Sequence, residues 1–296
     1  DNINHRIAIV GFASKSGNGN NTELLSIKGN NSGEVGVKYD SINDQNLKDV
    51  LQSMDTSNGQ TMVSDAISAL TANGGTRIDL GVDMANKILA ANPVETGKER
   101  NRVVVVFTDG APGDYGDWKS ASTSTANAAI ENAKKTKTTY ATTVYTVGVF
   151  SGADASNPSN LPNYTKWTTS WLGEDAPTEG NQIKNSNRFM HLVSSNYPNA
   201  SDITTPGAID PNLSGKSYYL SAGDSASLNN IFKQISEQIE TGGATTTLDS
   251  KTVIKDVVSD AFKLPNGATE KDITLETYKY DGEDKWTKNA GAMGAS

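Results

Sequence analysis

The chain has 296 residues, with 26 Lys and Arg against 34 Asp and Glu, and a formal net charge of −8 at pH 7. This acidic balance argues against a nucleic-acid-binding protein, because neutralising phosphates needs clustered positive charge. The sequence has no Cys and only two His, His5 and His191, which excludes disulfides, thiolate metal sites, Cys nucleophiles and multi-His zinc centres. Any bound metal must therefore have oxygen ligands.

The length suits two domains, or one enlarged α/β domain with a satellite. No stretch approaches the roughly 18 apolar residues of a membrane span, and residues 1–10 lack the basic-then-apolar pattern of a signal peptide. We therefore expect no membrane span in this chain.

The first part of the chain predicts a strand followed by two helices. His5–Ala13 is a short run rich in Ile and Val, typical of a buried strand. Ser14–Ser32 is rich in Ser, Gly and Asn around LLSI, which predicts a polar excursion with a hairpin or an exposed loop. Helical spacing of apolar residues predicts amphipathic surface helices over Asp44–Met54 and Thr61–Leu70. The apolar face of the second helix consists of Val63, Ile67 and Leu70.

The middle of the chain predicts a doubly wound parallel sheet. A Gly74-Gly75 turn leads into a helix with Asp79 in its first turn, where the helix dipole favours a carboxylate. Val103–Phe107 and Thr143–Phe150 are β-branched apolar runs, typical of strands covered by helices on both faces, and a helix is expected between them over Thr125–Lys137. This order of elements favours right-handed parallel crossovers.

The later part predicts an inserted arm and a closing helix. Residues 151–187 have no clear period and are too long for an ordinary α/β connection, so we interpret them as an arm or flap. Beyond it, Arg188–Ser195 is expected to be helical and Ser217–Leu220 a strand, while Ala226–Ile239 has the spacing of an amphipathic helix.

The pattern changes near residue 242 to short strand-like runs. We therefore expect an α/β domain over residues 1–241, a partial β-sandwich segment over 245–288 and a tail or linker over 289–296.

Two residues are candidates for chemistry in this sheet, since ligands of such sheets collect outside the carboxyl ends of the strands. Asp109 follows a strand that is too apolar to tolerate a lone buried carboxylate, and Thr76 precedes a helix in a neighbouring loop. A carboxylate, a hydroxyl and waters suit a hard divalent cation. The simpler alternatives are that Thr76 caps its helix and that Asp109 is a turn residue in Thr-Asp-Gly.

These residues carry a family resemblance. The segments GGTRIDLGVDMA (74–85) and VVVVFTDGAP (103–112) resemble the von Willebrand factor type A (VWA) domain. Within that family, NRFMHLVSSNYPNA (187–200) and KSYYLSAGDSASLNNIFKQISEQIE (216–240) are similar to the A domains of Gram-positive surface proteins and pilus-tip adhesins.

The resemblance implies a metal-ion-dependent adhesion site, or MIDAS. In the family a D-x-S-x-S loop, a Thr and an Asp hold one divalent cation, and by match Thr76 is the Thr and Asp109 the Asp. The cation would be Mg²⁺ or Mn²⁺, with Ca²⁺ as an alternative, and its open position would take an acidic side chain of a partner. Such a site binds without catalysis.

The chain departs from the family at one place, because it contains no D-x-S-x-S. The nearest imitation, Asp55–Gly59 (DTSNG), has Gly at the second Ser position and follows a predicted helix. The family places the loop after a central strand that would precede residue 5. We therefore expect an apolar groove in the sheet, either because the fragment is incomplete or because another polypeptide supplies the strand.

The expected function is that of a non-enzymatic adhesin of the cell surface or cell wall, which binds an extracellular host or matrix protein beside other pilus or cell-wall subunits. In such family members the A domain is inserted into a β domain. The alternative is a structural stalk module with a vestigial metal site, cross-linked by an isopeptide bond from Lys251, Lys255 or Lys263 near Glu276. The sequence has no Walker lysine loop, no G-x-S-x-G elbow and no G-x-G-x-x-G after a strand, which disfavours hydrolases and nucleotide enzymes.

Overall fold

A computed structural model provides the structure. The residues that it describes are 5–13, 15–16, 19–20, 22–29, 31, 33–71, 75–96, 100–109, 111–113, 123–165, 167, 178–213, 216–223, 225–242, 278–282 and 285–288. The chain divides into two compact units, Asp1–Thr246 and Thr247–Ser296.

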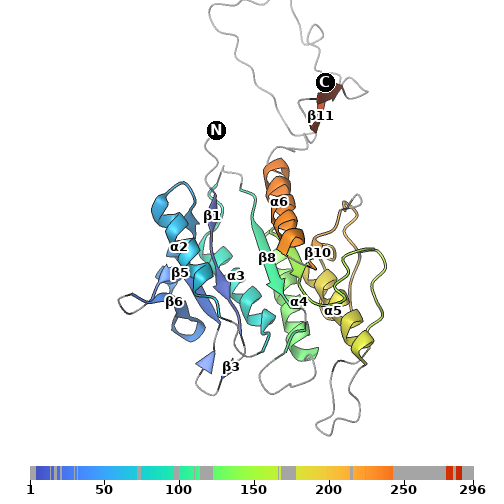
Figure 1. The fold of residues 1–296 in the computed structure, drawn as a ribbon, viewed down its shortest axis with the longest axis horizontal. Coiled ribbons are helices and arrows are strands. Elements are labelled where there is room, and N and C mark those ends of the chain that lie inside the picture. The colour runs from blue at the N-terminus through green and yellow to red at the C-terminus, as the bar shows by residue number, and fades with distance from the viewer. Residues whose placement is uncertain are drawn as a thin grey trace, which may run out of the picture. The chain divides into compact units, whose positions relative to one another are not determined.

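The first unit contains a parallel sheet of three strands in the order β10-β9-β8. They are β8 (Val103–Thr108), β9 (Thr143–Gly148) and β10 (Tyr219–Ser221). Helix α4 (Thr123–Thr138) makes the crossover from β8 to β9. The predicted order of strand, helix and parallel strand is confirmed. The unit is a mixed α/β structure whose helices flank the sheet, compatible with a Rossmann-like fold (Figure 1).

A second, antiparallel sheet is built from the N-terminal part of the chain. Its strands are β2 (Val10–Gly11), β5 (Glu23–Lys28) and β6 (Val35–Lys38), in that order. The expected strand at His5–Ala13 is divided, because β1 (Arg6–Ile7) pairs instead with β7 (Gln52–Ser53).

The polar excursion contains both a hairpin and a core strand. Strands β3 (Lys15–Ser16) and β4 (Gly19–Asn20) form the hairpin. The LLSI segment was expected in a hairpin or exposed loop, whereas it lies in β5 with Leu24, Leu25 and Ile27 buried. Leu24 and Ile27 of this strand belong to a hydrophobic core, although the polar residues on either side of LLSI had suggested an exposed segment.

The described residues of the first unit contain five further helices. They are α1 (Asp44–Asp49), α2 (Ser57–Ser68), α3 (Ile78–Ala91), α5 (Glu179–Val193) and α6 (Ser225–Gly242), with a short 3₁₀ turn at Tyr39–Ser41. Two expected bounds were wrong. The helix expected over Asp44–Met54 ends at Asp49, because Gln52 and Ser53 join β1 as a strand. Helix α5 begins at Glu179, inside the segment that was interpreted as an arm.

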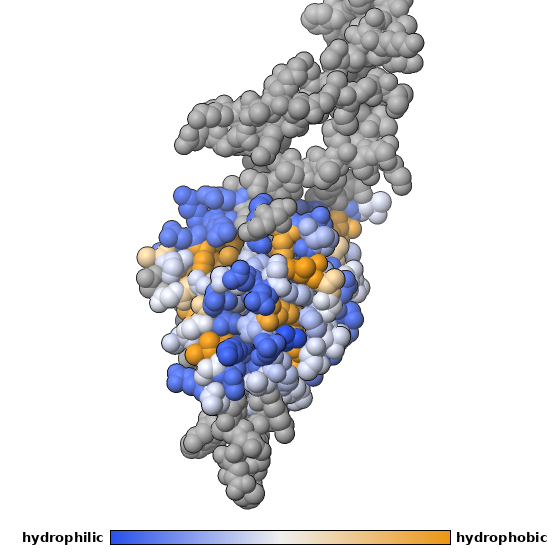
Figure 2. Space-filling model, turned by 90° about the vertical axis from the view of Figure 1, so that its right-hand side faces the viewer, coloured by the Kyte–Doolittle hydropathy of each residue, from blue (hydrophilic) through white to orange (hydrophobic). Residues whose placement is uncertain are grey.

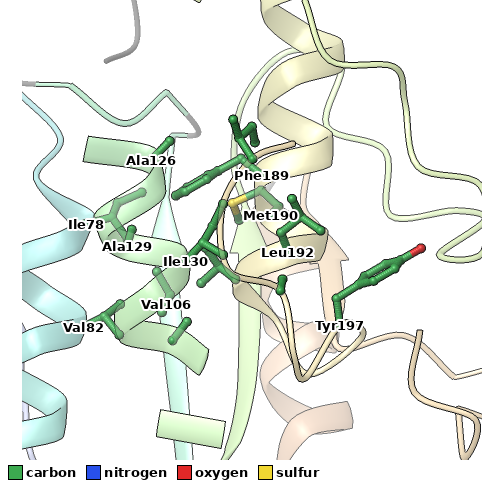
Figure 3. Packing of buried hydrophobic residues seen from close by; sticks show 14 of the residues in the cluster. Ile78, Val82, Val106, Ala126, Ala129, Ile130, Phe189, Met190, Leu192 and Tyr197 are labelled. Carbon is green, nitrogen blue, oxygen red and sulfur yellow. The ribbon is translucent and has the colours of Figure 1, made fainter. Parts of the chain in front are cut away.

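The main core lies between the parallel sheet and helices α3, α4 and α5. In Figure 3, Ile78 and Val82 of α3 face α4, while Phe189 and Met190 of α5 approach it from the other side. Trp167 is fully buried in this cluster, with its ring edge-on to Phe189 at 6.0 Å between centroids. Trp171, the second Trp of the expected arm, lies outside the described residues.

The described part of the arm is attached to α5 through two buried Asn side chains. The side chain of Asn185 accepts from the backbone N–H of Thr165 at 3.0 Å and donates to its carbonyl at 2.6 Å. Asn187 accepts from the N–H of Asp154 and donates to the carbonyl of Gly152, each at 2.8 Å. These bonds satisfy backbone groups of a segment without regular structure, so the segment packs on the helix.

Helix α3 joins the main core to a second core. Its Met84 and Ile88 pack with Leu24, Val37 and Val50 of the antiparallel side. A buried polar ladder fixes α3 against α4. Asn86 donates to the carbonyl of Asn132 at 2.9 Å and accepts from the hydroxyl of Thr136 at 2.7 Å. Because every member has a partner, this ladder fixes the rotation of α3.

Strand β8 is not covered on both faces, contrary to expectation. Val106 is 5% exposed, but Val105 and Phe107, which alternate with it, are 38% and 42% exposed. The expected apolar face of α2 is also only partly covered, since Val63 is buried while Ile67 and Leu70 are 55% and 49% exposed. The face of the molecule shown in Figure 2 has hydrophobic residues among hydrophilic ones.

The second unit is described only as a hairpin of β11 (Tyr278–Gly282) and β12 (Lys285–Lys288), which pair antiparallel. The rest of the expected sandwich segment 245–288 and the tail 289–296 lie outside the described residues. So do the isopeptide candidates Lys251, Lys255, Lys263 and Glu276. Within the described ranges, no helix is long and apolar enough to cross a membrane.

Candidate functional site

The two candidate residues, Thr76 and Asp109, lie next to each other although 33 positions separate them. Asp109 directly follows the last residue of β8, and Thr76 lies two residues before α3 begins. Both are therefore at the carboxyl end of the parallel sheet, where ligands of this architecture bind. The structure thus brings the two predicted residues together.

Backbone bonds between the two loops hold the site. The N–H of Thr76 donates to the carbonyl of Gly113 at 2.8 Å, and the N–H of Gly113 donates to the carbonyl of Thr76 at 3.1 Å. This reciprocal pair joins the loop before α3 to the loop after β8. The spacing between Thr76 and Asp109 is consequently set by main-chain geometry and not by side-chain contact alone.

The side-chain oxygens of this pair are spaced like ligands of one cation. The Thr76 hydroxyl lies 3.5 Å from Oδ1 of Asp109, a long contact for a hydrogen bond between oxygens. Adjacent ligands of an octahedral cation are separated by √2 times the metal–oxygen distance, which is about 3.0 Å for Mg²⁺ and about 3.3–3.7 Å for Ca²⁺. The spacing matches Ca²⁺ and is wider than adjacent Mg²⁺ ligands require, and the pair would supply one carboxylate and one hydroxyl oxygen to a hard divalent cation.

Thr76 does not cap helix α3, which was the simpler alternative. The residue at the N-cap of α3 is Arg77, and no side chain makes a capping bond there. The Thr76 hydroxyl is directed to Asp109 instead. Thr76 is therefore placed by its loop with its oxygen toward the carboxylate.

Asp79, expected in the first turn of α3, is there and forms an ion pair. It is 6% exposed, and its carboxylate accepts two hydrogen bonds from the Arg77 guanidinium, at 2.8 and 2.6 Å. Its backbone carbonyl also accepts from the side chain of Asn132 on α4. The positive charge beside Thr76 is thus balanced by Asp79, and the acidic charge of Asp109 remains available to a cation.

The sequence argument for Asp109 needs one correction. It assumed a buried carboxylate that would require a partner, but Asp109 is exposed. Thr108 is buried, with 4% of its surface exposed, whereas the next residue, Asp109, is exposed. Asp109 is therefore accessible to a ligand from solvent, and desolvation does not force it to have one.

The segment Asp55–Gly59 serves as a helix start. The Thr56 side chain accepts a hydrogen bond from the N–H of Gly59 at 3.1 Å, which caps α2. A Cβ on Gly59 would lie 2.0 Å from the carbonyl oxygen of Ser53, so close packing requires glycine there. The segment Asp55–Gly59 therefore caps α2 and packs at its start.

His191 is a buried structural residue. It is 1% exposed, its Nδ1 is 2.9 Å from the side-chain amide of Asn196, and its ring is edge-on to Tyr219. Burial lowers the pKa of His191 to about 4. The neutral imidazole is therefore the form that the fold holds, and His5 lies exposed beside β1.

One buried charge escaped sequence reasoning. The ammonium of Lys137, on α4, donates to four backbone carbonyls at the end of α5, those of Leu192, Val193, Ser194 and Tyr197, at 2.9–3.2 Å. Burial lowers the pKa of Lys137 to about 7. From the sequence alone, a lysine near the end of an Ala/Asn/Lys helix is expected to be exposed to solvent. Only the folded structure shows that Lys137 caps the C-terminus of α5.

Among the residues that the structure describes, no group of three or more His, Cys, Asp or Glu side chains is placed to hold a metal ion. The Thr76–Asp109 pair has one acidic member and is a different kind of site. Comparisons of the chain with protein-family models, curated proteins and solved structures find no match.

Proposed function

We propose that the chain is a non-enzymatic adhesin module of the VWA type, which binds an extracellular host or matrix protein through a divalent cation held by Thr76 and Asp109. The observation that carries the proposal is the 3.5 Å spacing of their oxygens at the carboxyl end of a parallel sheet. The resemblance of residues 74–85 and 103–112 to that family supplies the adhesive role.

The cation would act as a bridge between the two proteins. Thr76 and Asp109 supply two oxygens to one side of it, so a carboxylate of the partner can occupy a remaining position. The donor set suits Mg²⁺, Mn²⁺ and Ca²⁺, and the 3.5 Å oxygen spacing lies in the range for Ca²⁺. The exposure of Asp109 lets a macromolecular partner reach the site.

The setting of the proposed module is a Gram-positive cell wall or pilus, beside other subunits of that surface. Residues 245–288 would then belong to a β-sandwich that carries the α/β domain. Attachment to a cell surface agrees with a site that binds and does not turn over a substrate.

Attachment to immobilised matrix proteins tests the proposed function. The whole chain would be applied to collagen, fibronectin and laminin surfaces in Mg²⁺, Mn²⁺ or Ca²⁺, and again in EDTA. We expect attachment to one surface that requires a cation and is lost in Asp109→Asn, while the same substitution at Asp65, which is exposed on α2, retains it. Attachment that persists in EDTA and in Asp109→Asn would contradict a cation-dependent adhesin, and attachment to none of the surfaces in any cation would favour the structural stalk module.

A further inference from the structure

The last carbonyls of helix α5, at residues 192–194, need hydrogen-bond donors from outside the helix. They lie in the final turn, where no further helical N–H follows. The next two N–H groups along the chain are used elsewhere, because Ser195 donates to the carbonyl of Val144 and Asn196 donates to the hydroxyl of Ser194. Another element must therefore satisfy the end of α5.

A single ammonium group from α4 is that donor. Four carbonyl oxygens surround the Nζ atom of Lys137 at 2.9–3.2 Å, those of Leu192, Val193, Ser194 and Tyr197. An ammonium has only three N–H bonds, so it cannot give each of four acceptors a bond of its own. The nearly equal distances indicate oxygens arranged around a positive charge. We call these four oxygens the carbonyl cage.

The charge inside the carbonyl cage is stabilised by backbone dipoles. Lys137 is 9% exposed, and among the residues that the structure describes no Asp or Glu forms an ion pair with it. The C-terminus of a helix carries partial negative charge, which attracts a cation. Rings of backbone carbonyls are also the ligands with which proteins replace the hydration shell of a monovalent cation. The carbonyl cage therefore has the chemistry of a site for a monovalent cation.

The turn that follows α5 joins the carbonyl cage to the arm. Tyr197 is 5% exposed, and its hydroxyl donates to the carbonyl of Pro158 in the arm at 2.7 Å. Asn196 accepts from the N–H of Asp210 at its backbone carbonyl, and from the N–H of Tyr218 at its side chain. The position of this turn therefore sets the positions of three segments that are far apart in the sequence.

We propose that the carbonyl cage is a binding site for a primary ammonium ion, which Lys137 fills from within the chain, and that this cation positions the arm through Tyr197. Lys137 is then a positioning residue that acts by its charge and its N–H bonds, while its aliphatic stem only delivers them. The cage lies near the amino end of β9, because the turn after α5 bonds the backbone of Val144. It is separate from the proposed cation bridge at the carboxyl end of the sheet and does not depend on the proposed function.

Chemical rescue of Lys137→Ala, followed by hydrogen exchange, tests this proposal. The atoms that the substitution removes correspond to propylammonium. We expect Lys137→Ala to speed amide exchange at least tenfold at Ser195 and Asp210, and at Asn160, which lies beside Pro158 in the arm. Propylammonium should restore slow exchange at all three amides. Tetramethylammonium has the same charge but no N–H, so it should restore none of them.

Two further variants separate the cation from the packing of the side chain. Lys137→Met keeps the stem and its space, so it should speed exchange at the same amides and should not respond to propylammonium. Lys135→Ala, an exposed substitution on the same helix, should change none of them. If Lys137→Ala does not fold by itself, it should fold in propylammonium and stay unfolded in tetramethylammonium.

Three results would overturn the proposal. Exchange in a folded Lys137→Ala could match that of wild type, which would mean that the carbonyl cage needs no cation. Propylammonium and tetramethylammonium could have equal effects on Lys137→Ala, which would assign the effect of the substitution to lost packing. Exchange could also rise at Ser195 and Asp210 but stay unchanged at Asn160, which would disconnect the cage from the arm.

Discussion

Thr76 and Gly113 exchange reciprocal backbone hydrogen bonds of 2.8 and 3.1 Å. Through them the loop before α3 and the loop after β8 act as one unit, and the Thr76 hydroxyl is held near Asp109 without needing that contact. Removing the hydroxyl should therefore leave the fold intact and affect only ligands of the site.

Thr76→Val and Thr76→Ser form a matched pair for this point. Valine keeps the β-branched shape and the backbone bonds but loses the ligand oxygen. Without metal, we expect both variants to unfold within about 0.5 kcal/mol of wild type. At a hundred times the cation dissociation constant, wild type and Thr76→Ser should gain about 2.7 kcal/mol and Thr76→Val should gain little, measured by thermal unfolding. An equal gain in Thr76→Val would remove the hydroxyl from the ligand set.

Gly59 and Gly180 provide a test of the packing at the start of α2. A Cβ at Gly59 would lie 2.0 Å from the Ser53 carbonyl oxygen, whereas Gly180, in α5, has no heavy atom within 4 Å of that position. Gly59→Ala should lower the free energy of unfolding by about 3 kcal/mol or more, because backbone must move. Gly180→Ala should be neutral or raise it by up to about 1 kcal/mol. Denaturant unfolding measures both, and similar values would contradict the account of DTSNG as a tightly packed cap.

His191 predicts an acid-sensitive stability. Burial lowers the pKa of His191 to about 4, below the ordinary value of 6.5. Between those values the unfolded chain binds the proton and the folded chain does not, so stability falls as the pH decreases from 6.5 to 4, by about 3 kcal/mol. His191→Gln should flatten this part of the stability profile, and the exposed His5→Gln should not. An unchanged slope in His191→Gln would assign the acid sensitivity to other groups.

The buried Lys137 predicts that the free energy of unfolding changes with pH in the alkaline range. Burial lowers the pKa of Lys137 to about 7, below the ordinary value of 10.5. Above pH 7 the unfolded chain keeps a proton that the folded chain has lost, so wild type should become more stable toward pH 10 relative to Lys137→Met. The four carbonyls that the side chain bonds also lose their donor in Lys137→Met, at a cost of about 1–3 kcal/mol at pH 6.

Lys135→Met is the control for that substitution, since Lys135 is exposed on the same helix. Urea unfolding at pH 6, 8 and 10 measures both variants. A pH-independent difference between wild type and Lys137→Met would show that Lys137 stays charged throughout this range.

Local patterns predicted the parts of the fold in which burial and sequence period agree. Val103–Phe107 and Thr143–Phe150 are apolar throughout, and they pair as parallel strands. Asp109 could be placed at the carboxyl edge of the sheet because it follows β8, and Thr76 could be placed there because a helix that packs antiparallel on such a strand begins at that edge. The proximity of these two residues therefore followed from topology, although they are far apart in the chain.

Patterns failed where tertiary partners bury polar residues. The beginning of α5 is rich in Asn and Gln and lacks an apolar stripe, yet Asn185 and Asn187 are buried because they bond the backbone of the arm. The ladder through Asn86 is equally invisible locally, since its partners come from α4. Conversely, the apolar period of β8 predicted cover on both faces, while Val105 and Phe107 are exposed beside an unpaired edge.

Titration calorimetry of the chain with Mg²⁺, Mn²⁺ and Ca²⁺ tests the central claim most directly. Wild type should bind one cation per chain. Asp109→Asn, which keeps the size of the side chain and removes its charge, should weaken binding at least tenfold, and Asp65→Asn, an exposed substitution on α2, should leave it unchanged. No binding of any of the three cations to a cooperatively folded wild type, or equal binding by Asp109→Asn, would contradict a cation site at Thr76 and Asp109.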